Sequence, residues 1–175
     1  SGISAEISYN GIPLKMKGGE LMIVNVPDYI YDDHLPAIIA NGSLCVKVDG
    51  TCGGSPLAND DDIKKMKSLI QSAIAKGVTG VYVTGTYLAT YGDFIQTPVL
   101  SQAIEDFATG TIDLIIPNVS SIPRQAFSLC TAIKSLTFGS VITSLDYPFG
   151  GRISSGEPWT QRCDLTLAAG QQHID

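Results

Sequence analysis

The segment from Asp113 to Leu145 reads DLIIPNVSSIPRQAFSLCTAIKSLTFGSVITSL, and it repeats its own pattern once. The apolar pair Leu114/Ile116 recurs as Leu136/Phe138, an offset of 22 residues. Each pair is followed by two turn-type residues and then by a segment with Val and Ser that ends on an apolar residue. Self-similarity at a fixed period of roughly 20–30 residues is the signature of units that stack into a solenoid. The segment therefore predicts an α/β, β-rich repeat fold.

The order of residues in this segment resembles the BspA-like leucine-rich repeats of secreted and surface-anchored bacterial proteins. The matching positions are Leu114, Ile116, Pro117, Val119, Ile122, Ala126, Phe127 and Cys130, then Ile133, Leu136 and Phe138 of the next unit. The chain departs from the family pattern at Thr111, between Asn118 and Ile122 where one residue is missing, and after Phe149, which has no cysteine three residues later. The resemblance covers about residues 110–145. It implies a leucine-rich-repeat solenoid that serves adhesion or protein interaction with host or microbial partners.

Two further apolar pairs extend the series to four strands that we expect to stack. Val81/Val83 precede the repeat and Leu165/Leu167 follow it, at the longer intervals of 33 and 29 residues. Strand periodicity sends the residues between the inward pairs to the opposite face, where they should form an exposed column. This column consists of Tyr82, Ile115, Thr137 and Thr166. The last strand leaves an edge that needs a cover, so we expect either a longer repeat protein or a partner there.

The sequence before the repeats divides at the Gly- and Pro-rich stretch from Thr51 to Asn59. We expect residues 1–58 to form an N-terminal β-rich segment or cap, and residues 59–175 the leucine-rich-repeat-like domain. The first part reads as a three-stranded meander over 3–26, a short helix or loop over 28–43 and a strand over 44–48. The second part opens with a helix over 63–74, capped by Asn59 or Asp60 and ended by Gly77, and a second short helix follows Pro98.

Composition narrows the class of function. The net charge of −6 and the absence of a basic stripe argue against nucleic-acid binding. No apolar run approaches the ~20 residues of a membrane helix. The low share of charged residues, together with many Ser, Thr and Gly, favours an extracellular or cell-surface β-rich module. Since the chain begins without a charged-then-apolar leader, we expect an export signal that has been removed.

The four cysteines leave the redox state open. Cys45 and Cys52 flank the turn signal Asp49-Gly50, which is compatible with a disulfide or with two thiols. Cys130 falls at a repeat position where a small thiol packs in the core, so we expect it to be buried and reduced. Cys163 precedes the last strand, and no CxxC pair suggests zinc.

Catalytic and metal motifs give weak signals. The run Asn59–Asp62 and the cluster of Asp28, Asp32, Asp33 and His34 offer hard oxygens, but neither has the ligand spacing of a calcium or zinc site. We interpret the first as a helix cap and the second as a surface loop. No nucleophile, base and acid fall into a known motif, and TCGGS resembles a phosphate loop in composition alone. We therefore expect no catalysis, no cofactor and no metal.

The remaining signal is aromatic and favours binding. Tyr82, Tyr87, Tyr91 and Phe94 lie in and after the first repeat strand, and Trp159 lies in a later loop. Insertions in solenoids often sit on the face that binds, and exposed tyrosines make good contacts for sugars or proteins. We expect Tyr82, Tyr87 and Tyr91 to line the contact surface, with the strand column through Ile115 and Thr137 as the other candidate. A protein-binding adhesion module is the first hypothesis, a carbohydrate-binding accessory module the second and an enzyme of unrecognised type the third.

Overall fold

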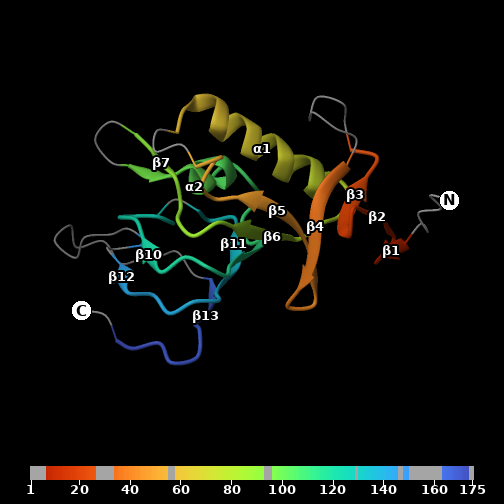
Figure 1. Cartoon of the computed structure of the whole chain (residues 1–175). Coiled ribbons are helices and arrows are strands. Elements are labelled where there is room, and N and C mark those ends of the chain that lie inside the picture. Colours follow the sequence, from red (N-terminus) through yellow and green to blue (C-terminus); the bar gives the residue numbers. More distant parts are fainter. Residues whose placement is uncertain are drawn as a thin grey trace.

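The computed structural model describes residues 7–26, 34–54, 58–92, 96–128, 130–145, 148–149 and 163–173. These residues form a β-rich α/β fold around one large mixed sheet of nine strands, in the order β1-β2-β3-β4-β5-β6-β9-β11-β13. The two described helices lie together on one face of this sheet (Figure 1). Because the sheet pairs β5 with β6, the N-terminal segment and the repeat region share one sheet and one hydrophobic core.

The first five strands pair antiparallel with their neighbours in sequence. They are β1 (Ile7–Tyr9), β2 (Ile12–Lys17), β3 (Glu20–Val24), β4 (His34–Ala40) and β5 (Ser43–Asp49). Two-residue turns with positive φ at both positions, such as Asn10-Gly11 and Asn41-Gly42, join the hairpins. The predicted meander and the predicted strand over 44–48 are therefore confirmed.

The prediction for residues 28–43 was wrong where the structure describes it. His34–Ala40 is strand β4, not a helix or a loop, and Pro36 lies opposite Met22 of β3. Proline within a run lowers the sequence signal for a strand, because it cannot donate a hydrogen bond to the ladder. Its two neighbours in the chain, Leu35 and Ala37, are both buried, and this burial outweighs the lost bond.

Helix α1 spans Asp60–Ala75 and follows the predicted pattern closely. Asn59 is its N-cap, and Asp62 completes a capping box: the Asn59 side chain accepts from the Asp62 N–H, and the Asp62 carboxylate accepts from the Asn59 N–H. Its apolar face, with Met66 and Ile70, packs into the core. The second helix, α2 (Val99–Ile104), is short and lies against α1.

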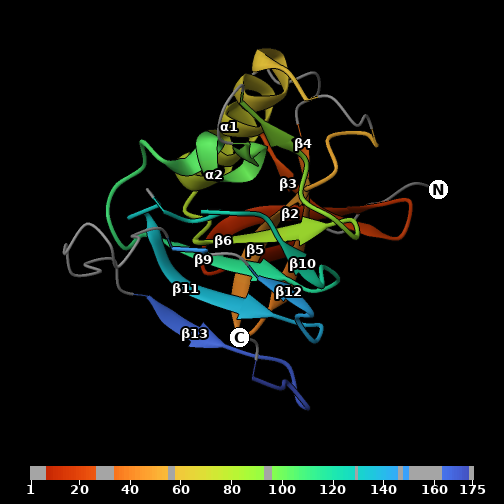
Figure 2. The same ribbon diagram turned by 90° about the vertical axis from the view of Figure 1, so that its left-hand side faces the viewer.

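The remaining strands of the large sheet run parallel and stack in register (Figure 2). They are β6 (Gly80–Thr84), β9 (Ile112–Ile116), β11 (Ile133–Phe138) and β13 (Asp164–Thr166). Val81 lies opposite Leu114, Leu114 opposite Leu136, and Leu136 opposite Leu165, as the repeat pattern predicts. A second parallel pair, β10 (Ser121–Ile122) and β12 (Ser144–Leu145), stacks beside it at an offset of 23 residues. A small hairpin of β7 (Thr90–Tyr91) and β8 (Thr97–Pro98) precedes α2.

Burial confirms the inward residues of the first three parallel strands and corrects the fourth. Leu114, Ile116 and Leu136 are fully buried and Phe138 nearly so, but Leu165 is 49% and Leu167 48% exposed. The last strand has β11 on one side, whereas within the described ranges no strand covers its other side. Leu165 in β13 and Leu167 just after it therefore occupy inward positions with no described strand beside them to bury them.

All four cysteines lie in the described part of the chain, and none forms a disulfide. Cys130 is 2% exposed, so the prediction of a buried, reduced thiol is confirmed. Its Sγ lies 3.6 Å from the Ser101 carbonyl oxygen on α2. Of the two alternatives for Cys45 and Cys52, the structure has two separate thiols.

Candidate functional site

The carboxyl ends of β5 and β6 meet the start of α1, where the sheet changes from antiparallel to parallel pairing. Loops that a rigid sheet holds in place at its strand ends are where recognition residues often collect. Two loops form the walls of this region, residues 49–54 after β5 and residues 84–89 after β6.

Asp49 organises the first loop. Its Oδ1 accepts hydrogen bonds from the Thr51 N–H (2.9 Å) and hydroxyl (2.7 Å), and its Oδ2 accepts from the Gly53 N–H (2.9 Å). Burial alone would raise the pKa of the Asp49 carboxyl, but these bonds favour the charged form and hold the pKa below its ordinary value of 3.8. The loop amides that a phosphate would need are thus directed at the protein's own carboxylate. The Gly-rich composition of TCGGS serves this turn.

The second loop is held against the first by backbone hydrogen bonds. The Gly50 N–H donates to the Thr84 carbonyl (2.9 Å), and the Ala89 N–H donates to the Gly50 carbonyl (2.8 Å). Within this second loop Leu88 and Ala89 are buried, while Tyr87 is 43% exposed. Tyr87 therefore projects from a segment that is fixed on both sides.

Gly85 shows how closely the two loops approach. Its φ of +95° lies in the left-handed region, and a Cβ at this position would lie 2.6 Å from Thr51 Cγ2. Glycine is therefore required both by the backbone conformation and by the contact.

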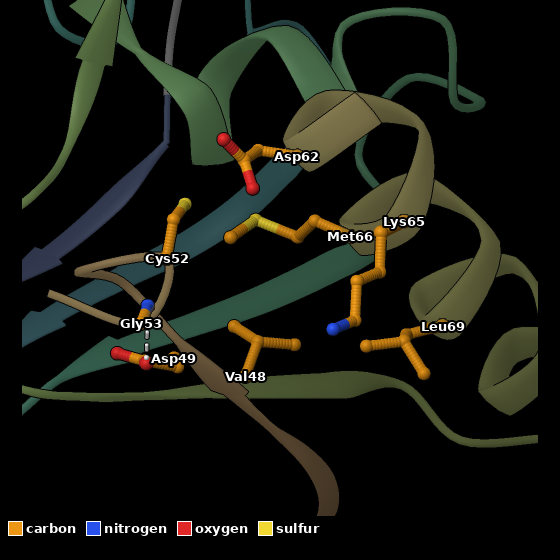
Figure 3. Close-up of a pocket in the computed structure, with 8 residues that line it drawn as sticks. All are labelled: Val48, Asp49, Cys52, Gly53, Asp62, Lys65, Met66 and Leu69. Carbon is orange, nitrogen blue, oxygen red and sulfur yellow. Dashed lines mark hydrogen bonds between the residues drawn. The ribbon is translucent and has the colours of Figure 1, made fainter. Parts of the chain in front are cut away.

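A pocket of about 190 Å³ opens between the first loop and α1 (Figure 3). Val48, Met66 and Leu69 give it apolar walls, and Cys52, Asp62 and Lys65 supply polar groups. In Figure 3 the Cys52 thiol and the Asp62 carboxylate extend from opposite walls, one from the loop and one from the first turn of α1. The pocket has room for one amino-acid side chain, with both signs of charge beside it.

The chemistry of this pocket suits binding better than nucleophilic catalysis. Burial, together with the negative charges of Asp62 and Asp49, raises the pKa of the Cys52 thiol to about 11, although Lys65 acts in the opposite direction. The thiolate is the nucleophilic form, and a pKa this high leaves it scarce near neutral pH. Across the described ranges, no group of three or more His, Cys, Asp or Glu side chains is placed to hold a metal ion.

The predicted strand column has the expected orientation but not the expected exposure. Tyr82 lies opposite Ile115, Ile115 opposite Thr137, and Thr137 opposite Thr166, on the face away from Leu114 and Leu136. Yet Ile115 is only 7% exposed, which corrects the prediction that it lies on an open surface.

The cover comes from the β4–β5 hairpin. Asn41, at the hairpin turn, places its Nδ2 3.5 Å from Thr137 Oγ1, so the turn lies over the outward face beside Ile115. Tyr82 and Thr137 keep part of their surface and Thr166 is exposed. The column is therefore a partly covered strip, and Ile115 is unsuited to contact a partner.

The structure separates the predicted tyrosines. Tyr82 lies in the middle of the sheet, whereas Tyr91, in β7, packs against the core, and its carbonyl accepts a hydrogen bond from Gln102 of α2 (2.9 Å). Tyr87 has the largest exposed fraction of the three. That Tyr82, Tyr87, Tyr91 and Thr137 contact a partner stays a prediction. Phe94 and Trp159 lie outside the described residues.

The acidic candidates have structural roles where they are described. Asn59 and Asp62 form the capping box of α1, as interpreted from the sequence. His34 belongs to β4, is 9% exposed and has its Nε2 3.0 Å from Lys17 Nζ. Asp28, Asp32 and Asp33 lie outside the described residues.

The pocket beside Cys52 was not predicted from the sequence. Its signal was present, because a strand that ends in a Gly-rich loop and continues into a capped helix places that loop at the carboxyl edge of the sheet. The residues themselves, such as Lys65 and Met66, carry no motif.

A search with models of protein families finds no match to this chain, and neither the curated proteins nor the solved structures contain a match.

Proposed function

We propose that the chain is a non-catalytic binding module of leucine-rich-repeat type that recognises protein partners at a cell surface or in the extracellular space. The observation that carries the proposal is Tyr87, an exposed aromatic side chain on a loop fixed by the Gly50–Thr84 and Gly50–Ala89 hydrogen bonds. A fixed aromatic contact loses little conformational entropy on binding, and such residues often dominate protein interfaces.

The repeat character of the proposal is supported by the two parallel ladders. β9 and β11 pair at the 22-residue offset of the repeat, and β10 and β12 pair at nearly the same offset beside them. Units that stack on their neighbours at a constant offset are what a solenoid of repeats consists of. The extracellular placement and the adhesive role follow from the BspA-like resemblance and from the composition. No helix within the described residues is long and apolar enough to cross a membrane.

A protein partner is favoured over a sugar by the distribution of aromatic and apolar side chains. A sugar-binding platform would need the tyrosines in an exposed row, but Tyr91 packs against the core and Tyr82 lies on a different part of the sheet. The pocket beside Cys52 is lined by apolar and charged groups and has the size of one side chain. A pocket of this kind can hold an anchoring side chain of a partner protein.

The test is a printed array of extracellular-matrix proteins and glycans, followed by affinity measurements on the strongest hit. We expect a protein hit whose affinity falls at least tenfold in Tyr87→Ala, since loss of an aromatic anchor costs about 2 kcal/mol or more. Ile39→Ala is the matched control, because Ile39 is a 47% exposed apolar residue on β4, and its affinity should stay within about twofold of that of the unmodified chain. Both variants should keep the thermal midpoint.

Unchanged affinity in a folded Tyr87→Ala variant would contradict the proposed contact surface. Binding to glycans without any protein hit would replace the proposal with the carbohydrate-binding alternative.

A further inference from the structure

The open end of the parallel stack carries the largest group of exposed apolar side chains among the described residues. Four apolar side chains that are 37–49% exposed lie in or close to strands β12 and β13 in the chain: Val141, Leu145, Leu165 and Leu167. A groove of about 250 Å³ runs between them, lined by Phe138, Ile142, Leu145, Phe149, Leu165 and Leu167 among others. We refer to these six residues as the β13 groove. Figure 2 shows β13 at the free edge of the sheet, on the far side of β11 from β9.

The β13 groove continues an interface that the chain already uses within itself. Val81, Leu114, Leu136 and Leu165 form one apolar row across the strands, in which each side chain covers the preceding one. The first three are at most 1% exposed, and Leu165 is half exposed at the end of the row. A further strand with an apolar residue opposite Leu165 would bury it in the same way.

β11 pairs with one edge of β13, but the other edge has no strand partner within the described ranges. Proteins usually protect such edges with lysine, proline or a bulge. The segment Cys163–Leu167 has neither lysine nor proline, and Asp164 is its one charged residue.

We propose that a second copy of this chain pairs its β13 antiparallel with this edge, about a two-fold axis that is normal to the sheet and passes midway between the two copies of Leu165. Opposite residues of an antiparallel pair point to the same face, so Leu165 of one copy meets Leu165 of the other in the apolar layer. Asp164 then faces Thr166 of the second copy, which avoids a pair of like charges, and Cys163 faces Leu167. A two-fold interface is self-complementary and closes at a dimer, so it does not generate fibres.

Sedimentation equilibrium of the unmodified chain from about 1 to 300 µM tests the proposal. We expect a reversible monomer–dimer equilibrium that strengthens with added salt, because each chain carries a net charge of −6 and salt screens the repulsion. Leu165→Asp should weaken the dimer at least tenfold, whereas Ile39→Asp, an equally exposed site on β4, should leave it unchanged. Leu145→Lys is a second variant in the β13 groove, and it should also weaken the dimer at least tenfold. Near-ultraviolet circular dichroism shows that each variant is folded.

Cysteine crosslinking tests the register. In a background with Cys52→Ser and Cys163→Ser, the single variants Asp164→Cys and Thr166→Cys are oxidised separately and as a mixture. The mixture should form a disulfide dimer, because the two positions lie opposite each other. Each variant alone should not, since two copies of position 164 are about 8 Å apart, beyond the reach of a disulfide. A monomer at every concentration, a dimer that persists in both groove variants, or crosslinking of single variants as strong as in the mixture would overturn the proposal.

Discussion

Strands β11 and β13 are neighbours with the same pattern of apolar residues, but they differ sharply in burial. Leu136 of β11 is fully buried and Leu165 of β13, its partner across the ladder, is 49% exposed. The difference comes from their positions in the sheet: β11 has a strand on both sides, and β13 pairs with β11 alone among the described strands. In this sheet, an apolar pattern therefore specifies which face a side chain occupies, whereas its burial depends on the neighbouring strand.

The largest expected difference between the two regions is in thiol reactivity. Cys130, buried against α2, should be modified only when the structure opens, whereas the partly exposed Cys163 should react in the native state. For an opening free energy of about 4–5 kcal/mol, Cys130 should react roughly a thousandfold more slowly than Cys163. Mass spectrometry after alkylation for increasing times measures both rates.

The pH dependence of these rates provides a check. Burial raises the pKa of Cys130 to about 11 and also raises that of Cys163. The thiolate fraction, and with it the alkylation rate of Cys163, should rise roughly tenfold per pH unit between pH 7 and the pKa. Equal rates for the two thiols at pH 7 would show that the region around Cys130 is not a closed core.

Truncating a leucine should destabilise the fold much more in β11 than in β13. Leu136→Ala should lower the free energy of unfolding by about 2–5 kcal/mol, because it leaves a cavity in a filled interior. Leu165→Ala should cost less than about 1 kcal/mol, since its side chain is half solvated and leaves no enclosed cavity. Denaturant unfolding at concentrations low enough to avoid association measures both, and similar costs would contradict the distinction between interior and edge.

A smaller loss of stability is expected where the segments after β9 and β11 come closest. Gly139 donates its N–H to the Ile116 carbonyl (3.0 Å), and a Cβ on it would lie 2.7 Å from the Cα of Pro117. Backbone atoms cannot move aside as a flexible side chain can, so Gly139→Ala should cost about 1–3 kcal/mol. Ala168→Gly, two residues after β13, is the control at the open end and should change stability by no more than about 1 kcal/mol. An unchanged free energy of unfolding in Gly139→Ala would mean that the segments after β9 and β11 lie farther apart than their contact at Pro117 indicates.

Sequence periodicity predicted the elements whose determinants are local. The 22-residue offset gave the register of β9 and β11, and Asn59 with Asp62 gave the start of α1. The prediction failed where distant residues decide the outcome. Ile115 has the signature of an outward residue, but it is buried, on a face where the hairpin turn at Asn41, 74 positions earlier in the chain, contacts the neighbouring Thr137. No local pattern carries that information.

The candidate site shows the same limit. Tyr87 and Tyr91 differ by four positions and stand in similar sequence contexts, yet Tyr87 is exposed and Tyr91 packs against the core. Which tyrosine faces solvent depends on the hydrogen bonds between the loops after β5 and β6, and these connect residues more than 30 positions apart.

The contact between Asn41 and Thr137 also has a consequence for how the chain folds. The β4–β5 hairpin is local and can form within microseconds, but its turn can reach its final position only after β11, 96 residues further along, has joined the sheet. Contacts with so large a sequence separation slow folding, because a long loop must close before they stabilise anything. During synthesis from the ribosome, the hairpin would wait several seconds for its partner strand, at roughly 5–20 residues per second. Positive φ at Asn41 and Gly42 keeps the turn in shape during that interval, so that the two halves of the sheet can join without rearranging it.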